Sequence, residues 1–390
     1  MRTVPTTPLG SLVSIVGGGT PSKSRPEFFE GTIPWVTPKD MKVWMILDSE
    51  DHISEEAVAA SPAKLVPKGT VLVVVRSGVL KHTLPVAIAG RPVTLNQDMK
   101  GLLCGDGIDP RFLAFFLKSA EPRLLTTVRG TTADNIPLDE LKALEVPRVP
   151  LTEQRRIADI LDKADAIRRK RKEAIALTEE LLRSAFLEMF GDPVTNPKGW
   201  PVKPLGELLA FLTSGSRGWA QHYADSGETF LRIQNVRKDL LDLSDVAFVQ
   251  PPDSAEARRT ETKPGDVLLS ITADLGRTAV VPASLPRAFI NQHLAILRPQ
   301  GVNAEYLSAF LASEGGQLQV NRRNKGGVKA GLNFDDIRSV EVLLPPVAAQ
   351  EKFATAKRRI RATNADIERA LLHDDDLFNS LVARAFAGEL

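Results

Sequence analysis

Two long stretches of the chain place apolar residues at helical spacing and contain neither glycine nor proline. They cover residues 153–190 and 349–387. Pro150 precedes the first and Gly191 follows it, while Pro346 precedes the second and Gly388 follows it. Such start and stop residues are typical of helix ends. At 1.5 Å per residue, a helix of about 38 residues is about 57 Å long, so each predicted helix is longer than a small domain is wide.

The apolar residues of both stretches repeat every three or four positions, which predicts one seam along each helix. In the first helix the predicted seam holds Ile157, Ile160, Ala164, Ile167 and Leu181, and in the second Phe353, Ile360, Ile367, Leu377 and Leu381. A seam sustained over several heptads favours a coiled-coil partner, and the nearest candidate is the other helix. Since the chain passes through a whole domain between them, we expect an antiparallel pair. The alternative is that each helix packs only on its own domain.

The remainder of the chain is mixed in character and is duplicated. Short apolar runs at 70–75 and 267–271, bounded by turn residues, predict buried strands. Pro8-Leu9-Gly10 returns as Pro204-Leu205-Gly206, at an offset of 196 residues, and later matches keep their order at nearly the same offset. We therefore predict an α+β fold with two related mixed domains and two long helices that form an antiparallel coiled coil. The expected parts are a domain at 1–150, a helix at 151–190, a linker at 191–203, a domain at 204–346 and a helix at 347–387.

Composition narrows the class of protein without pointing to a ligand. The 390 residues are 43% hydrophobic and 25% charged, and the formal net charge is +2. Residues 1–150 hold 17 basic and 16 acidic residues, and residues 200–346 hold 16 of each, so neither domain is basic as a whole. The single cysteine, Cys104, excludes an internal disulfide, and the absence of an 18-residue apolar run predicts a cytoplasmic protein with no membrane segment.

Contacts to nucleic acid would therefore depend on local clusters. The best candidate is the run 322–329, where cations stand beside glycines, and it contributes Arg322, Arg323, Lys325 and Lys329. Loops that follow buried strands commonly carry function. They add Thr37, Lys39, Arg76, Ser77, Lys81, Arg129 and Thr131 in the first domain, and Ser214, Arg217, Arg232, Gln234, Asn235 and Arg237 in the second. Arginine and lysine bind phosphates, and arginine, asparagine and glutamine can read base edges, although each residue is equally compatible with an ordinary surface position.

Two further groups of residues have competing interpretations. The basic clusters 168–172 and 357–361 on the predicted helices suit either spacer phosphates or a surface that faces solvent or a partner. The pairs Asn96-Gln97 and Asn291-Gln292 occur in both halves next to apolar residues. Because residues shared by two domains cannot distinguish different bases, we expect them to have a structural hydrogen-bonding role.

Signals for catalysis are weak. Asp253, Glu261 and Lys263 match the spacing of metal-dependent nucleases, but the last two lie in a polar run where such a site requires a core strand. The chain has no phosphate-binding loop and no Asn-Pro-Pro-Tyr motif of adenine methylation, and its five histidines are scattered. We predict no catalytic residue, no bound metal and no cofactor in this chain.

Several motifs together resemble the specificity subunits of type I restriction-modification enzymes. They are Gly-Gly-Gly-Thr-Pro-Ser-Lys at 17–23, Ile-Pro-Trp-Val-Thr-Pro-Lys-Asp-Met at 33–41, Asn-Gln at 96–97, Pro-Leu-Thr-Glu-Gln at 150–154 and the linker from Phe190 to Trp200. The second half departs from this pattern, with Arg232-Ile233-Gln234-Asn235-Val236 in place of the tryptophan-containing run. The resemblance covers nearly the whole chain.

This resemblance implies that the mixed domains are target-recognition domains for double-stranded DNA and that the helices set their spacing. It also implies that two methyltransferase subunits, which would bind S-adenosylmethionine, dock on the helices and that motor-nuclease subunits join for cleavage. Because the loop residues of the two domains differ, we expect an asymmetric bipartite target with an unread spacer. Two alternatives are a coiled-coil scaffold joining two protein-interaction domains and a single-chain nuclease built on Asp253.

Overall fold

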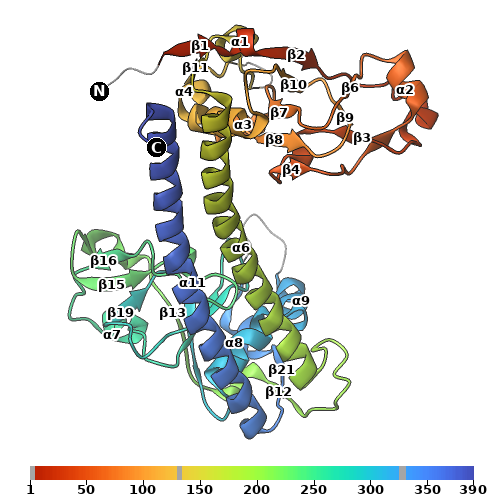
Figure 1. The fold of residues 1–390 in the computed structure, drawn as a ribbon. Coiled ribbons are helices and arrows are strands. Elements are labelled where there is room, and N and C mark those ends of the chain that lie inside the picture. Colours follow the sequence, from red (N-terminus) through yellow and green to blue (C-terminus); the bar gives the residue numbers. More distant parts are fainter. Residues whose placement is uncertain (1–4, 130–133, 325–330) are drawn as a thin grey trace. The chain divides into compact units, whose positions relative to one another are not determined.

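The structure is a computed structural model that describes residues 5–129, 134–324 and 331–390. Its contacts divide the chain into two units. The first consists of Met1–Lys172 and Arg369–Leu390, and the second of Glu173–Glu368. Each unit therefore contains one mixed domain together with parts of both long helices (Figure 1).

The first domain contains two main sheets and a small two-stranded ladder. A five-stranded sheet has the order β2-β10-β7-β8-β4, and in it only the β8–β4 pair is parallel. A four-stranded sheet has the order β5-β3-β9-β6. The strands are β1 (Thr6–Pro8), β2 (Val13–Gly17), β3 (Ile33–Val36), β4 (Met45–Ile46), β5 (His52–Ile53), β6 (Leu65–Val66), β7 (Val71–Val74), β8 (Val86–Ala89), β9 (Val93–Leu95), β10 (Met99–Cys104) and β11 (Glu145–Pro147).

The second domain repeats this plan. One sheet has the order β13-β20-β17-β18, which corresponds to β2-β10-β7-β8, and another has the order β14-β16-β15-β19. The strands are β12 (Val202–Pro204), β13 (Leu209–Ser214), β14 (Tyr223–Ala224), β15 (Glu228–Leu231), β16 (Ala247–Val249), β17 (Val267–Ser270), β18 (Thr278–Val280), β19 (Ala288–Ile290), β20 (Leu294–Pro299) and β21 (Glu341–Leu343). The mixed fold of helices and sheets is confirmed.

Short helices pack beside the sheets of each domain. They are α1 (Leu9–Leu12), α2 (Glu55–Ala60), α3 (Pro110–Ser119), α4 (Glu121–Thr126) and α5 (Leu138–Lys142) in the first domain, and α7 (Ala255–Thr260), α8 (Ala304–Ala312), α9 (Glu314–Arg323) and α10 (Phe334–Arg338) in the second. Asp109 and Asn303 begin α3 and α8, because each side chain accepts hydrogen bonds from the first backbone amides of its helix. In the adjacent sheets, α3 contacts β7 and β8, and α8 contacts the equivalent strands β17 and β18.

The two long helices are α6 (Leu151–Phe190) and α11 (Val347–Ala387). A buried glutamine fixes the start of each: Gln154 accepts from the amide of Asp109 at 2.9 Å, and Gln350 accepts from that of Asn303 at 2.9 Å. Gly191 and Gly388 follow the two helices with positive φ angles of 79° and 76°, as the sequence predicts for helix ends. The same sequence signals therefore begin and end both helices.

The helices pair in antiparallel fashion within each unit. In the first unit, Arg156 donates to the Leu390 carbonyl at 2.7 Å and Arg168 to Asp375 at 2.5 Å, so later residues of α6 contact earlier residues of α11. In the second unit, Thr178 donates to Asn364 at 2.5 Å. The expected antiparallel coiled-coil pair is confirmed, and the alternative of helices packed only on their own domains is wrong.

The helices also complete the core of each domain, and aromatic rings dominate these contacts. In the first unit, the ring of Phe112 lies 5.2 Å from that of Phe386 on α11. In the second, the ring of Tyr306 lies 4.8 Å from that of Phe190 on α6, and Phe190 lies 5.5 Å from Phe353 on α11. Each mixed domain is therefore packed against both long helices.

The predicted seam is wrong at three positions. Ile157 and Phe353 are buried, and Ile160, Ala164, Ile360, Ile367 and Leu381 are partly buried, but Ile167, Leu181 and Leu377 are 50%, 53% and 55% exposed. The physical reason is that polar residues occupy the middle of the helix contact. Besides the Arg168–Asp375 and Thr178–Asn364 pairs, Arg171 is paired with Asp374 and Arg361 with Glu179. Apolar spacing could not reveal a seam built from ion pairs.

The Arg168–Asp375 pair allows a direct test of this polar seam. We expect Arg168→Leu to lower the free energy of unfolding by about 1–2 kcal/mol, because Asp375 then stays partly buried without its partner. The double variant with Asp375→Leu should recover that loss, since two apolar side chains replace the pair and Asp165 keeps its 3.0 Å contact with Arg169. Thermal unfolding followed by circular dichroism measures both effects. Lys170→Leu, at an exposed position of α6, is the control, and equal stabilities of the two Arg168 variants would contradict this account.

Cys104, at the end of β10, is predicted to be unreactive. Burial raises the pKa of its thiol to about 12. Since only the thiolate is nucleophilic, we expect alkylation by iodoacetamide at pH 8 to be about a thousandfold slower than for a thiol of ordinary pKa. Mass spectrometry of the native protein measures this rate, and the same protein in urea is the control. Fast labelling in the folded state would show that burial does not hold the thiol protonated.

Candidate functional site

The loops that follow several strands meet at one edge of each domain. In the first domain, the amides of Val75 and Arg76 donate to the carbonyl of Asp98 at 2.9 and 3.2 Å. In the second, the amide of Ile271 donates to the carbonyl of His293 at 2.9 Å. We call these regions the first and second loop edges. They comprise the described residues of 17–22, 37–44, 76–83, 96–98 and 129–135 in the first domain, and of 214–218, 232–246, 271–277, 291–293 and 324–331 in the second.

Both loop edges are built around the same close contact between two loops. A Cβ atom on Gly18 would lie 1.8 Å from the carbonyl oxygen of Asn96, and one on Gly215 would lie 2.0 Å from that of Asn291. The side chains of Asn96 and Asn291 accept from the backbone amides two residues later, each at 3.1 Å. These asparagines shape the loops, in line with the structural role expected for them, and only glycine fits opposite them.

A 3₁₀ turn follows the equivalent strands β3 and β15. In the first domain it covers Pro38–Asp40, and the backbone amide of Thr37 donates to the Asp40 side chain at 2.8 Å. In the second it covers Ile233–Asn235, and the amide of Arg232 donates to the Asn235 side chain at 2.9 Å. Different sequences therefore build the same turn. Thr37 and Asn235 are buried, so these two candidates support the loop and are not placed to contact DNA directly.

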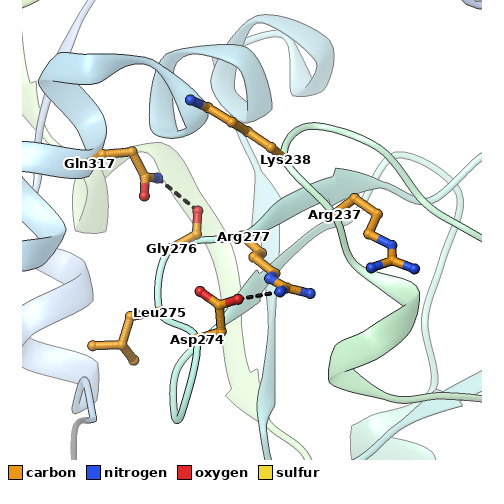
Figure 2. A pocket seen from close by; sticks show the side chains of 7 residues that line it. All are labelled: Arg237, Lys238, Asp274, Leu275, Gly276, Arg277 and Gln317. Carbon is orange, nitrogen blue, oxygen red and sulfur yellow. Dashed lines mark hydrogen bonds and ion pairs between the residues drawn. The ribbon is translucent and has the colours of Figure 1, made fainter. Parts of the chain in front are cut away.

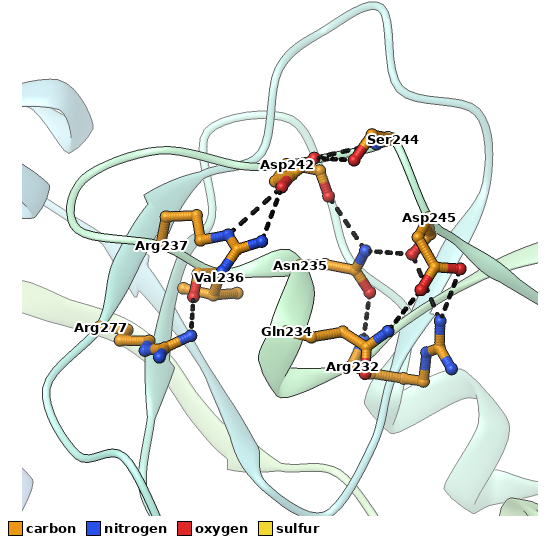
Figure 3. A network of polar contacts seen from close by, with 9 residues as sticks. All are labelled: Arg232, Gln234, Asn235, Val236, Arg237, Asp242, Ser244, Asp245 and Arg277. Carbon is orange, nitrogen blue, oxygen red and sulfur yellow. Dashed lines mark hydrogen bonds and ion pairs between the residues drawn. The ribbon is translucent and has the colours of Figure 1, made fainter. Parts of the chain in front are cut away.

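Acidic side chains hold the polar residues of the second turn (Figure 3). The Gln234 amide donates to Asp245 at 2.7 Å, and the Arg232 guanidinium lies 3.2 Å from the same carboxylate. Arg237 pairs with Asp242 at 3.1 Å. Hydrogen bonds from the side chain and amide of Ser244 lower the pKa of Asp242, which stays ionised and fixes Arg237. These contacts order the loop that carries four of the predicted residues, Arg232, Gln234, Asn235 and Arg237.

The other candidates of the first domain are mostly exposed cations at its loop edge. Lys39 pairs with Asp51 at 2.9 Å, Arg76 lies 3.6 Å from Asp98, and Lys81 lies 3.9 Å from Asp134. Arg129 is exposed, whereas Ser77 caps the 3₁₀ helix Gly78–Lys81 by accepting from the amide of Val79. Thr131 lies outside the described residues.

In the second domain the predicted basic cluster is divided between two roles. Arg323 donates to the side chain and the carbonyl of Ser339, at 2.8 and 2.5 Å, and so joins the end of α9 to the end of α10. Arg322 is exposed, as is Arg217 beside Ser214, whose carbonyl accepts from Arg259 at 2.7 Å. Lys325 and Lys329 lie outside the described residues. The described part of the cluster therefore leaves Arg322 free to face a ligand.

The structure also shows two cations that the sequence analysis missed, Lys238 and Arg277. Together with Arg237 they line an open pocket of about 310 Å³ at the second loop edge (Figure 2). The remaining lining residues are Asp274, Leu275, Gly276 and Gln317. Lys238 directly follows the candidate Arg237, so the same loop argument could have found it. Arg277 lies in the loop that follows the predicted strand 267–271, so the loop argument could have found it as well.

The nuclease-like pattern is not assembled into a site. Asp253 is paired with Arg258, while Glu261 lies 2.8 Å from Arg287. Among the described residues, no group of three or more histidine, cysteine, aspartate or glutamate side chains could hold a metal ion. In the same part of the chain, no helix is long and apolar enough to span a membrane.

Comparison with known proteins finds similarity to the specificity subunits of type I restriction enzymes. The family model "Type I restriction modification DNA specificity domain" matches residues 1–177. The type I restriction enzyme EcoR124I/EcoR124II specificity subunit of Escherichia coli is 37% identical over 181 residues, which are 46% of this chain and 45% of that protein. The MjaIX specificity subunit of Methanocaldococcus jannaschii is 23% identical over 401 residues, covering 96% of this chain and 91% of that one. The chain thus aligns with less than half of the first relative and most of the second.

Two solved structures share the fold. The S subunit of a type I restriction-modification system from M. genitalium matches with a TM-score of 0.62 and 16% identity, covering 99% of this chain and 97% of that one. A chain from a study of complex assembly and conformational transition of the type I system matches with a TM-score of 0.54 and 19% identity, covering 100% and 99%. Each of these matches extends over almost the whole length of both chains.

Proposed function

We propose that this chain, which is similar to type I restriction-modification specificity subunits over nearly its whole length, selects the DNA target of such a complex and performs no catalysis itself. One observation carries the proposal to this chain: the same loop edge is built twice with different side chains. At equivalent positions of the 3₁₀ turn, the first domain has the exposed Lys39 and the second has the exposed Gln234. A shared frame with different polar groups suits two domains that read different bases, and so an asymmetric bipartite target.

The long helices supply a surface for partner subunits. Ile167, Leu372 and Leu377 are exposed in the first unit, and Leu177, Leu181 and Leu187 in the second. Exposed apolar side chains on a helix favour burial by another protein. We propose that two methyltransferase subunits, each binding S-adenosylmethionine, dock there, and that motor-nuclease subunits join this complex on DNA in the cytoplasm.

Mapping of DNA methylation tests the proposal. The chain is co-expressed with its methyltransferase subunit in a host that lacks DNA methylation, and methyladenine is mapped across the genome. We expect one asymmetric target made of two short specified parts separated by an unspecified spacer. The methyltransferase alone and the chain alone are controls, and neither should methylate. A palindromic target, or methyl transfer by the chain alone, would contradict the proposal.

A protein-binding scaffold is the second candidate function. It is favoured by Val43, Met45 and Leu47, which alternate in the segment around the two-residue edge strand β4 and are all exposed. An apolar strand edge of this kind is typical of protein contacts. Salt dependence separates the two functions, because a protein that contacts phosphates loses affinity for duplex DNA steeply as salt rises, whereas a scaffold shows no duplex binding to lose.

A further inference from the structure

The loop from Val236 to Asp242 is fixed at one unusual residue. Asp239 has a positive φ of 59°, a conformation that residues other than glycine rarely adopt. Its carboxylate accepts from the Ser308 hydroxyl of α8 at 2.5 Å and from the Lys357 ammonium of α11 at 2.6 Å. Strained backbone of this kind persists only where surrounding contacts hold it, and it clusters at functional sites.

Lys357 is the most deeply buried charged residue of this cluster. Its side chain is 3% exposed, and its ammonium also lies 2.9 Å from the Glu305 carboxylate and 3.2 Å from the Glu305 carbonyl. Burial of a charged side chain costs free energy, and removal of its partner costs more because the charge is then buried without an ion pair. This difference makes the contact between Lys357 and its carboxylate partners specific. Lys357 thus ties the loop of the recognition domain to α8 and to α11 within the second unit.

The first domain anchors the same loop position by different chemistry. Val73 of β7 pairs with Val86 of β8, just as Leu269 of β17 pairs with Thr278 of β18, so Val86 and Thr278 are equivalent. In the second domain, Lys238 pairs with Thr278 in an isolated parallel β-bridge. In the first domain, Met45 of β4 pairs with Ile88 of β8, also in parallel, and Ile88 lies two residues beyond Val86.

By this register, Trp44 is the counterpart of Asp239. In the first domain, the ring of Trp44 is stacked on that of Phe115 of α3, with centroids 4.5 Å apart. In the second domain, Asp239 instead accepts a hydrogen bond from Ser308 of α8. Two unrelated side chains thus perform one task, which indicates that the position of this loop matters to both domains.

The anchored loop carries cations to the pocket. Arg237 and Lys238 are exposed on either side of the pocket rim, and Arg277 lies below them (Figure 2). Arg237 is paired with Asp242, and Arg277 with Asp274. Within the described part of the chain, Lys238 has no ion-pair partner. Three cations and one carboxylate line the pocket, so its excess positive charge suits an anionic oxygen.

We propose that this pocket binds a backbone phosphate of the target DNA and that Lys357, acting through Asp239, positions Arg237 and Lys238 for that contact. The inference rests on the proposed function. Phosphate contacts orient a protein on DNA without reading sequence, so this site would set the register in which the second domain meets its bases. Lys357 is accordingly a positioning residue, and Lys238 and Arg277 are binding residues.

The phosphate contact is tested with Lys238→Ala and Arg277→Met in the complex with the methyltransferase subunits. The probes are a duplex containing the mapped target and a mixed-sequence duplex of equal length. We expect each variant to lose about three- to tenfold in affinity for both duplexes, and the slope of log affinity against log salt to fall by about 1. Unchanged affinity, or a loss confined to the target duplex, would overturn the phosphate assignment.

The positioning role of Lys357 is tested by coupling. We expect Lys357→Met to weaken both duplexes as Lys238→Ala does, and the combination of the two to be no weaker than Lys357→Met alone. Lys357→Met/Asp239→Asn, which removes both charges, guards against simple unfolding. It should keep the circular dichroism of the parent yet bind as weakly as Lys238→Ala. Lys352→Met, at an exposed position of the same helix, is the matched control and should bind normally.

Hydrogen exchange gives a readout that needs no DNA. We expect faster exchange across residues 236–246 in the double-charge variant and no change there in Lys352→Met. Additive losses from Lys357→Met and Lys238→Ala, or normal DNA binding by the double-charge variant, would overturn the positioning role. If the parent complex methylates no target and binds no duplex, the proposed function itself fails; if the parent binds and the variants match it, only this inference fails.

Discussion

Replacement of residues 204–346 by the corresponding domain of a relative is expected to change one half of the methylated target and leave the other half unchanged. The physical reason is that every described residue of the second loop edge lies within this segment. Its anchor, Lys357, is outside the segment, but the residues that Lys357 contacts, Asp239 and Glu305, are inside. Methyladenine mapping with the exchanged chain measures the result.

The exchange succeeds only if the inserted domain fits the helices that remain. Tyr306 and Phe310 must be retained, because the ring of Tyr306 packs on Phe186 and Phe190 and lies 6.2 Å from that of Phe310. An exchange that keeps the original second domain but replaces residues 1–150 is the matched control and should alter the other half-site. A change in both halves after either exchange would contradict two independent readers.

The features that could be predicted from sequence are those that repeat. Glycine-free helical spacing located both long helices, and the run Val71–Val74, all buried, marked a central strand. The repeat at an offset of 196 residues predicted two related domains. In each case many residues carry the same signal, so a single exception does little harm.

The contact between the two long helices could not be predicted in their middle parts, because the apolar pattern there selected residues on the exposed face of each helix. Ile167 and Leu181 fit the 3-4 spacing but are exposed. Arg168 lies one residue after Ile167, and Thr178 is a polar residue at a position of the apolar pattern. Both contact α11. Polar partners contributed by the second helix decide which face is inside. A single helix sequence does not contain that information.

Individual site residues were predicted less well than the loops that carry them. Thr37 and Asn235 lie in the expected loops but are buried. Whether a polar side chain faces inward or outward depends on partners distant in sequence, such as Asp245 for Gln234. Arg277 was missed although it lies in the loop after the predicted strand 267–271, and only the structure shows that it lines the pocket.

The largest loss of stability from a single substitution is expected for Phe190→Ala. Phe190 is fully buried, with ring centroids 4.8 Å from Tyr306, 5.1 Å from Phe186 and 5.5 Å from Phe353. Truncation leaves a cavity where α6, α11 and the second domain meet, so we expect the free energy of unfolding of the second unit to fall by about 3–5 kcal/mol. Hydrogen exchange resolved by peptide measures this loss in the second unit separately from the first.

The repeat provides a matched comparison, because Phe386 lies 196 residues after Phe190 and packs on Phe112 and Phe116 in the first unit. Phe386 is only partly buried, so Phe386→Ala should cost less, about 1–3 kcal/mol, and should affect the first unit. Leu187→Ala, at an exposed position of α6, should change stability by less than about 0.5 kcal/mol. If Phe190→Ala and Leu187→Ala gave equal stabilities, Phe190 would not be the centre of this core, and the packing of the helices on the second domain would have to be reassigned.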